Sequence, residues 1–344
     1  MQEDVKKICD YLRDIVNIGS PTGYTENVMD YVRNTLKSLG VNYHTTNKGA
    51  VVASIKGKDD ENQITLSAHI DTLGAMVREI KADGKLSITA IGSFMMNSIE
   101  GENCKIQSSS GKTYSGTVQT VKPSVHISGD EASNMKRTPE NMEVVIDEKV
   151  FSKEDVQKLG IDVGDFVCID PRFKITENGF VKSRHLDDKA STAVLLYCME
   201  YIKKNNITPS KTVNFFISNY EEVGHGAAAA IPEKTKEFIS VDMGAPGLNQ
   251  NSSEYAVCIC AKDSSGPYDF SLRKKLTETC IANNIDYKVD IYPHYGSDAS
   301  CAVRAGWDVK TGLIGPGVFA SHAYERTHID SLNATKELVL KYII

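Results

Sequence analysis

The chain has 344 residues, of which 41% are hydrophobic and 24% are charged, as in an ordinary globular protein with a sizeable core. The 39 basic and 45 acidic residues give a formal net charge of -6 without any block of like charge, which argues against a nucleic-acid-binding groove. We expect a cytoplasmic protein outside the membrane, since no run of 18 apolar residues or export signal is present and the eight scattered cysteines favour reduced thiols.

The N-terminal segment predicts two helices and then two strands. Apolar residues at helical spacing favour one helix over residues 4–18 and a second that follows the Ser-Pro-Thr-Gly turn and ends at Gly40. The short β-branched runs AVVASIKG and QITLSAHID predict a strand pair, and the second strand ends at His69 and Asp71.

From about Leu73 to Pro171, short strands and turn signals such as KADGKL and SSSGKTYSG replace the helical patterns. One short helix within SKEDVQKLGIDVGD is bounded by Gly160. The remainder is typical of a small barrel or sandwich. We therefore expect a β-rich domain at residues 73–170, inserted into a discontinuous domain of residues 1–72 and 171–344.

After Gly179, helices alternate with strands again. A buried helix is predicted at 191–204, with further helices at 268–283 and 297–305, and the intervening strands are TVNFFIS, EFISVDM, EYAVCICA, DYKVDIY and DVKTGLI. This alternation indicates an α/β fold whose sheet is covered by helices on both faces.

Ionisable residues gather where these strands end, which is where open α/β sheets bind ligands. They are His69, Asp71, His185, Asp187, Asp188, Glu221, Glu222, Asp242 and, in a loop after another strand, His322. Histidine nitrogen and carboxylate oxygen without thiolate favour Zn²⁺, with Co²⁺ or Mn²⁺ as alternatives. Because there are too many carboxylates for one tetrahedral ion, we expect two ions about 3.5–4 Å apart that share a bridging carboxylate.

Simpler interpretations exist for each residue. His69 alone is as well explained as a core histidine, but the H-x-D spacing puts Asp71 on the same side of the strand, where it can fix the His69 tautomer. Helix capping explains one of Asp187 and Asp188, not both. A surface turn would explain Glu221 and Glu222, although the apolar run Phe-Phe-Ile before them predicts a buried approach.

The ordered motifs SAHIDTLGAMV, SRHLDDKAS, YEEVGHGA, SVDMG and SHAYERT surround the β-rich insertion, and over nearly the whole chain they resemble the dinuclear metal aminopeptidases of metallopeptidase family forty-two. The resemblance implies a mixed sheet sandwiched by helices, as in phosphorylase/hydrolase-like aminopeptidases. It also implies a tetrahedral dodecamer built from dimers, with the inserted domain making dimer contacts. The family's commoner motif has Glu after the first Asp, whereas this chain has Thr72, so substrate preference does not carry over.

The same resemblance implies roles for individual residues. Two divalent ions would be bound by His69, Glu222, Asp242 and His322, with Asp187 bridging them. Glu221 would be the general base, Asp71 would orient His69, and a cis peptide would join Asp187 to Asp188.

Adjacent strand residues point in opposite directions, so for Glu221 and Glu222 to serve one site the chain must turn sharply between Tyr220 and Gly224. Less specific candidates are also present. His225 and His294 suit surface or core positions or the substrate side of the site, and His185 receives no role. Asp298 is expected either near the substrate amine or, like Ser297, as a helix N-cap, while His328 and Asp330 are expected to cap the last helix.

The predicted function is removal of N-terminal residues from short peptides by a metalloaminopeptidase. Alternatives are an N-acyl amidohydrolase on the same scaffold and a peptide-binding protein that uses a sheet edge. A glycosidase is a poor alternative, because glycoside hydrolysis uses a pair of carboxylates and gives the histidines no role.

Overall fold

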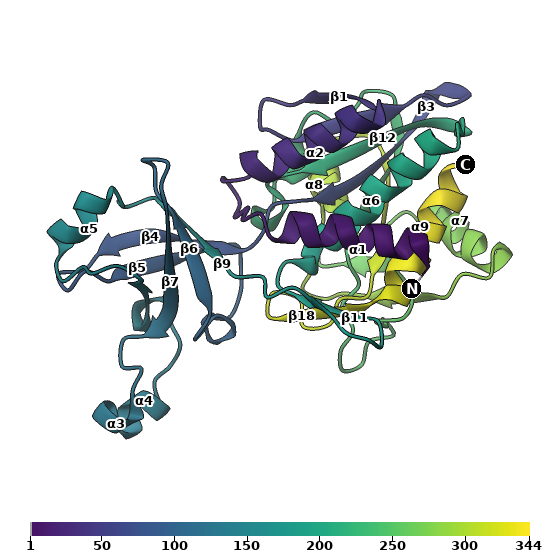
Figure 1. Ribbon diagram of the computed structural model, residues 1–344. Helices are drawn as coiled ribbons and strands as arrows, with labels where there is room; N and C mark the ends of the chain where they lie inside the picture. Colours follow the sequence, from purple (N-terminus) through teal and green to yellow (C-terminus); the bar gives the residue numbers. More distant parts are fainter. Residues whose placement is uncertain (1) are drawn as a thin grey trace.

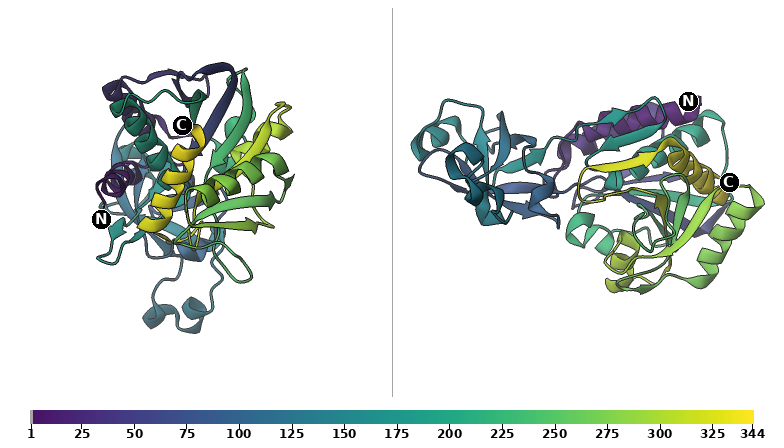
Figure 2. Two further views of the ribbon diagram at one scale, coloured as in Figure 1. Left: turned by 90° about the vertical axis from the view of Figure 1, so that its right-hand side faces the viewer. Right: turned by 90° about the horizontal axis from the view of Figure 1, so that it is seen from below.

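A computed structural model describes residues 2–344, which form an α/β body and a separate β-barrel (Figure 1). The barrel projects from one end of the body, and both termini lie on the body (Figure 2). Within residues 2–344, none of the helices has the length and apolarity needed to traverse a bilayer.

The body is built on a nine-stranded mixed sheet. Its order is β1 (Asn42–Thr45), β2 (Val51–Ile55), β12 (Lys211–Ser218), β3 (Asp59–His69), β13 (Thr235–Val241), β17 (Lys310–Pro316), β14 (Val257–Asp263) and β15 (Gly266–Pro267), with β16 (Tyr287–Ile291) beside β14. Strands β12, β3, β13 and β17 run parallel, so their carboxyl ends meet at one edge. The prediction that β2 and β3 pair is wrong, because β12 lies between them.

Both faces of this sheet are buried, as expected. Alternate residues of one strand serve the two faces, since Phe215 packs into one core and Phe216 into the other. The first core is formed with helices α1 (Glu3–Val16), α2 (Glu26–Leu39), α6 (Leu186–Lys204), α7 (Phe270–Ala282) and α9 (Ile329–Ile343). The short helix α8 (Asp298–Arg304) contributes to the second core. The expected α/β sheet between helical layers is thus confirmed.

The β-rich segment closes into a six-stranded antiparallel barrel with its own apolar core. Its strands, in barrel order, are β4 (Gly74–Ile80), β5 (Leu86–Ile91), β8 (Met142–Ile146), β7 (Thr113–Thr120), β6 (Asn103–Gln107) and β9 (Phe166–Ile169). The short helices α3 (Val125–Ser128), α4 (Asp130–Ser133) and α5 (Lys153–Leu159) connect strands. Helix α5 starts at the N-cap Ser152 and ends at Gly160, as its sequence predicts.

The body also contains a small three-stranded sheet, whose middle strand leads into α6. It consists of β10 (Lys174–Ile175), β11 (Phe180–Ser183) and β18 (Glu325–His328). The expectation that His185, Asp187 and Asp188 follow a strand of the main sheet is therefore wrong, since the strand before them, β11, pairs with β10 and β18. His328 caps α9 by accepting the backbone N–H of Asp330, in line with the sequence.

Candidate metal centre

Three parallel strands deliver carboxylates and a histidine to the same edge of the main sheet. His69 is the last residue of β3, and Asp242 directly follows β13. Glu221 and Glu222 lie in a 3-10 turn, η3 (Glu221–Val223), that begins three residues after β12 ends. Because the three strands are parallel, these four residues lie at one end of the sheet.

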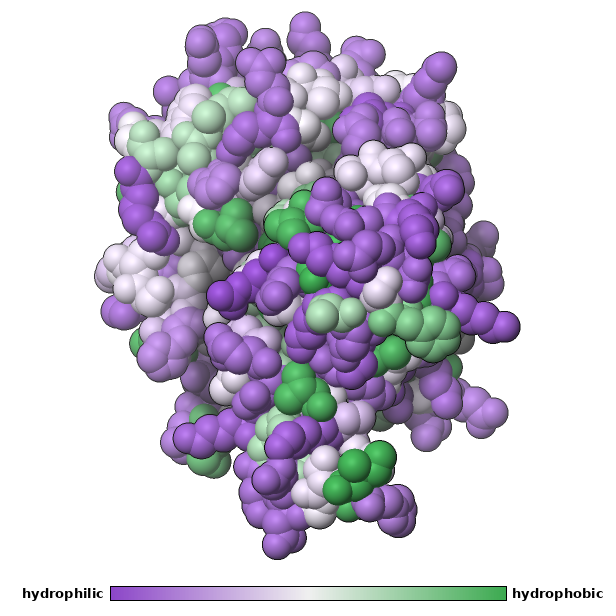
Figure 3. All heavy atoms as spheres, turned by 90° about the vertical axis from the view of Figure 1, so that its left-hand side faces the viewer, coloured by the Kyte–Doolittle hydropathy of each residue, from purple (hydrophilic) through white to green (hydrophobic). Residues whose placement is uncertain are grey.

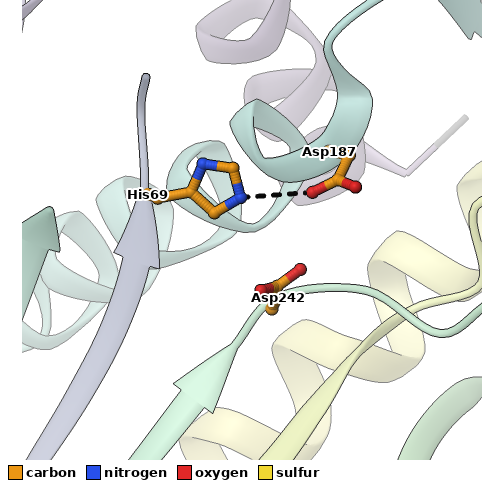
Figure 4. A group of neighbouring side chains, drawn as sticks. All are labelled: His69, Asp187 and Asp242. Atoms are coloured by element: carbon orange, nitrogen blue, oxygen red, sulfur yellow. Dashed lines mark hydrogen bonds and ion pairs between the residues drawn. The ribbon is translucent and has the colours of Figure 1, made fainter. Parts of the chain in front are cut away.

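Asp187 lies between two histidines and links two halves of the cluster. Its Oδ1 is 3.2 Å from Nε2 of His69, and its Oδ2 is 3.4 Å from Nε2 of His322. One donor atom each from His69, Asp187 and Asp242 lies within 4.8 Å of the others (Figure 4). On the other side, Nε2 of His322 is 3.5 Å from Oε2 of Glu222. The cluster thus has a His69–Asp242 half and a His322–Glu222 half, with Asp187 in both.

Asp188 follows Asp187 through a cis peptide bond, as the sequence resemblance implied. Its Oδ2 accepts the backbone N–H of His69 at 3.2 Å. Both aspartates lie in the irregular first turn of α6, where their backbone angles are not helical. Asp188 therefore holds the end of β3 rather than capping a regular helix.

Asp71 contacts His69 mainly through its backbone. Nδ1 of His69 is 3.0 Å from the Asp71 carbonyl oxygen and 3.6 Å from its carboxylate Oδ1. The carboxylate instead accepts the Thr22 hydroxyl at 2.6 Å and the backbone N–H groups of Glu221 and Glu222 at 3.2 and 3.3 Å. Asp71 consequently ties the His69 ring to the turn that carries the two glutamates.

The sharp turn predicted after Tyr220 is present. Gly224 ends η3 in the left-handed region with φ 82°, which glycine adopts at little cost. Ser297, not Asp298, caps α8, and the Asp298 carboxylate accepts the Ser218 hydroxyl at 2.5 Å and the Ala227 N–H at 2.9 Å. Asp298, which is 2% exposed, thus links the end of β12 to the segment that follows the glutamate turn.

Three residues that hold the cluster escaped prediction. Glu325 accepts the backbone N–H groups of Asp187 at 3.1 Å and His322 at 3.0 Å. The carbonyl of Ser93, in a loop of the barrel, is 2.6 Å from Nδ1 of His322. Tyr295 donates its hydroxyl to Asp242 at 2.6 Å. For two of them the sequence signal was proximity, since Glu325 lies in the motif SHAYERT and Tyr295 lies two residues before Ser297.

The remaining histidines have separate positions. His294 lines a cavity of about 580 Å³ together with Glu221, Asp242 and Arg304. His225 stacks on the Tyr220 ring, with centroids 5.0 Å apart.

Two further residues discussed from the sequence, His185 and Thr72, lie on the barrel side of the body. Both line a second cavity, of about 410 Å³. Burial lowers the pKa of His185 to about 3, so this histidine is neutral at physiological pH.

Several carboxylates are buried together in the cluster, and this burial disfavours their ionised forms. It raises the pKa of Glu221 and Glu222 well above their usual value of 4.5 and, with help from Asp187, raises the pKa of Asp242 to about 7. Burial opposes protonation of His322, but Asp187 and Glu222 nevertheless raise its pKa to about 10. The protein alone therefore stabilises added positive charge at this point.

The donor set fits divalent cations. All the side-chain donors are imidazole nitrogens and carboxylate oxygens, as hard or borderline ions prefer. In addition, Oε1 of Glu222 and Oδ1 of Asp188 are buried without any hydrogen-bond partner among residues 2–344. A buried carboxylate oxygen without a partner is costly, and a cation nearby would remove that cost.

Comparison with known proteins places the chain in a family. The model of the M42 glutamyl aminopeptidase family matches residues 49–338. YhfE of Bacillus subtilis (strain 168), to which an aminopeptidase activity is attributed, is 50% identical over 98% of both chains. The lysyl aminopeptidase of Pyrococcus furiosus is 24% identical over 64% of this chain and 61% of its own.

Solved structures share the fold at low sequence identity. An aminopeptidase of the archaeon Desulfurococcus kamchatkensis superposes with a TM-score of 0.89 at 21% identity, covering 98% of this chain and 95% of its own. The TET1 peptidase of Pyrococcus horikoshii gives a TM-score of 0.85 at 20% identity, covering 97% and 98%. The resemblance carried by the five motifs is confirmed, and the chain belongs to the M42 glutamyl aminopeptidase family.

Proposed function

We propose that this chain is a metal-dependent aminopeptidase that releases N-terminal residues from short peptides. The observation that carries the proposal is the placement of Asp187, whose two oxygens face the two histidines at 3.2 and 3.4 Å. Such a carboxylate suits a bridge between two ions. One ion would be held by His69, Asp242 and Asp187, and the other by His322, Glu222 and Asp187.

When bound, the two ions, Zn²⁺ or Co²⁺ or else Mn²⁺, would polarise the scissile carbonyl and acidify the attacking water. Glu221 is the general base of the proposal. Its Oε2 lies 3.6 Å from Nε2 of His69, within the cluster and on the wall of the large cavity. The carboxylate takes a proton from the water and later delivers it to the nitrogen of the leaving amine.

The test is hydrolysis of unblocked and N-acetylated dipeptides and tripeptides by chelator-stripped protein, with and without added Zn²⁺, Co²⁺ or Mn²⁺. We expect cleavage of unblocked peptides only, and only with metal. Glu221→Gln should bind metal but lose about 10²–10⁴-fold in turnover. Glu233→Gln, at an exposed position outside the cluster, is the matched control and should keep full activity.

Two results would overturn the proposal. Preference for N-acetylated peptides would move the function to an amidohydrolase, and saturable peptide binding without cleavage by fully metallated protein would move it to a binding protein.

We also propose a homo-oligomer assembled from dimers into a tetrahedral dodecamer, with the barrel making dimer contacts. Support comes from the TET1 peptidase of P. horikoshii, which can assemble into a tetrahedron or a large octahedral shell. The barrel end of the molecule displays apolar side chains among polar ones (Figure 3). Ile127 and Phe151 are 87% and 80% exposed there. Large exposed apolar side chains are typical of protein contact surfaces.

We further propose that the protein acts in the cytoplasm. All eight cysteines are buried and unpaired within the described residues 2–344, as suits a reducing compartment.

A further inference from the structure

Tyr295 connects the wall of the large cavity to the cluster. It lies between β16 and α8, and its side chain lines the cavity together with His294 and Arg304. The hydroxyl oxygen is 2.6 Å from Oδ1 of Asp242 and 3.1 Å from the carbonyl oxygen of Met243. A hydroxyl has one proton to donate, and the shorter distance and the charged acceptor favour Asp242.

The position of Tyr295 does not depend on Asp242. Its carbonyl oxygen accepts both the N–H and the hydroxyl of Ser264, at 3.1 and 2.5 Å. Its ring packs on the ring of Tyr292, with centroids 5.3 Å apart. The hydroxyl is therefore presented to Asp242 by a fixed frame, which is what a residue that orients a metal ligand requires.

Asp242 is held at its backbone as well, because its carbonyl accepts the Ser191 hydroxyl at 2.5 Å. With the main chain fixed, the remaining freedom of Asp242 is rotation of its carboxylate. The Tyr295 bond to Oδ1 restrains that rotation, and a carboxylate oxygen of Asp242 lies within 4.8 Å of donor atoms of His69 and Asp187.

We propose that Tyr295 is a positioning residue that orients the carboxylate of Asp242 and thereby sets the cation affinity of the His69–Asp242 half of the cluster. The proposal rests on the proposed function only in requiring that this half binds a divalent cation. It needs no particular substrate and no turnover.

The test compares Tyr295→Phe with Tyr292→Phe, each of which loses one hydroxyl from the same pair of packed rings. The Tyr292 hydroxyl contacts Ser252, at 2.6 Å, and is the matched control. Chelator-stripped proteins are titrated with Zn²⁺ against a chromophoric chelator, and Co²⁺ absorption spectra are recorded. We expect Tyr295→Phe to raise one of the two dissociation constants for Zn²⁺ by about 10–100-fold, as loss of a group that orients a ligand does. The Co²⁺ absorption spectrum should change as well. Tyr292→Phe should alter neither.

Two backgrounds assign the weakened site. In His322→Ala, which keeps His69, Asp187 and Asp242, the effect of Tyr295→Phe should persist, and in His69→Ala it should disappear. Unchanged affinity in Tyr295→Phe, or an equal loss in both tyrosine variants, would overturn the proposal. Failure of the proposed function looks different, since peptides would stay uncut while the affinity shift remained.

Discussion

Gly226 shows how one residue sets the shape of the site. A Cβ at this position would lie 2.2 Å from Oδ1 of Asp298, the oxygen that accepts the Ala227 N–H. The adjacent carbonyls of His225 and Gly226 accept the Lys48 ammonium at 2.5 and 2.8 Å. Because this segment directly follows Glu221 and Glu222, glycine at 226 lets Asp298 come close enough to fix it.

Gly226→Ala should therefore push Asp298 away and loosen the glutamate turn. We expect the free energy of unfolding to fall by about 1–3 kcal/mol, the usual cost of overpacking, and peptide turnover to fall with it. Urea unfolding and a peptide assay measure the two effects. The control is Gly247→Ala, where the nearest atom would be 3.9 Å away, and its stability should change by less than about 0.5 kcal/mol. Equal stability of the two variants would show that the turn accommodates a methyl group.

At the scale of single residues, the sequence predicted the candidate ligands at strand ends. It did not predict the residues that hydrogen-bond to those ligands. Parallel strands bring their carboxyl ends together, so His69, Glu222 and Asp242 could be grouped from strand patterns alone. Tyr295 and Glu325 contact residues that are distant in the sequence, and no local spacing of residues predicts such a contact. Their roles become visible only from distances.

At the scale of the elements, helices α1 and α6 are joined by a hydrogen bond to the buried carboxylate of Glu200. The Tyr11 hydroxyl donates to Oε2 of Glu200 at 2.5 Å, and Lys204 lies 2.5 Å from Oε1. Burial opposes ionisation of Glu200, but these partners lower its pKa below the usual value. A carboxyl with a lowered pKa stabilises the fold above its unfolded pKa, near 4.5, and loses this contribution as pH falls through its folded pKa.

Glu200→Gln should consequently lower the free energy of unfolding at pH 7 by about 2 kcal/mol, the range for hydrogen bonds to charged groups. The difference from the parent protein should narrow as the pH falls below the usual value of 4.5 and through the lowered pKa of Glu200. Urea unfolding at several pH values measures this. Glu278→Gln in α7, whose side chain is 59% exposed and pairs with Lys274, should have almost no effect at any pH. If the loss of unfolding free energy in Glu200→Gln did not change with pH, packing and not charge would hold the two helices together.

Periodicity predicted which elements exist better than which elements pair. The long helices and the buried strands followed from the spacing of apolar residues. The neighbours of β2, the place of β11 outside the main sheet and the short strands β1 and β18 did not, because a strand's pattern records its burial and not its partner.

Across the whole molecule, the body and the barrel have separate cores but share the site through a few contacts. Arg184, just before the α6 entrance, lies 2.5 Å from the Ser98 carbonyl and 2.9 Å from Glu102 of the barrel segment. Ser93 contacts His322. Subunit contacts through the barrel would thus bear on the domain that supports a candidate ligand.

Ile127→Asp and Phe151→Asp, made singly, test whether the barrel mediates assembly. A charge at a buried contact is costly, so we expect a smaller mass by size exclusion with light scattering than for the parent protein. Leu248→Asp, at a position 92% exposed on the body, should keep the parent mass. A monomeric parent, or an unchanged mass in both barrel variants, would contradict the proposed interface.

The hydrogen bond between His322 and Ser93 also bears on the order of events during synthesis. The two residues are 229 positions apart, and Ser93 leaves the ribosome long before His322. All the strands of the barrel end by Ile169, so the barrel can close while the C-terminal half is still being made. When His322 emerges, its hydrogen-bond acceptor is already in place. The earliest domain to be completed thus serves as the template for the last candidate ligand to arrive.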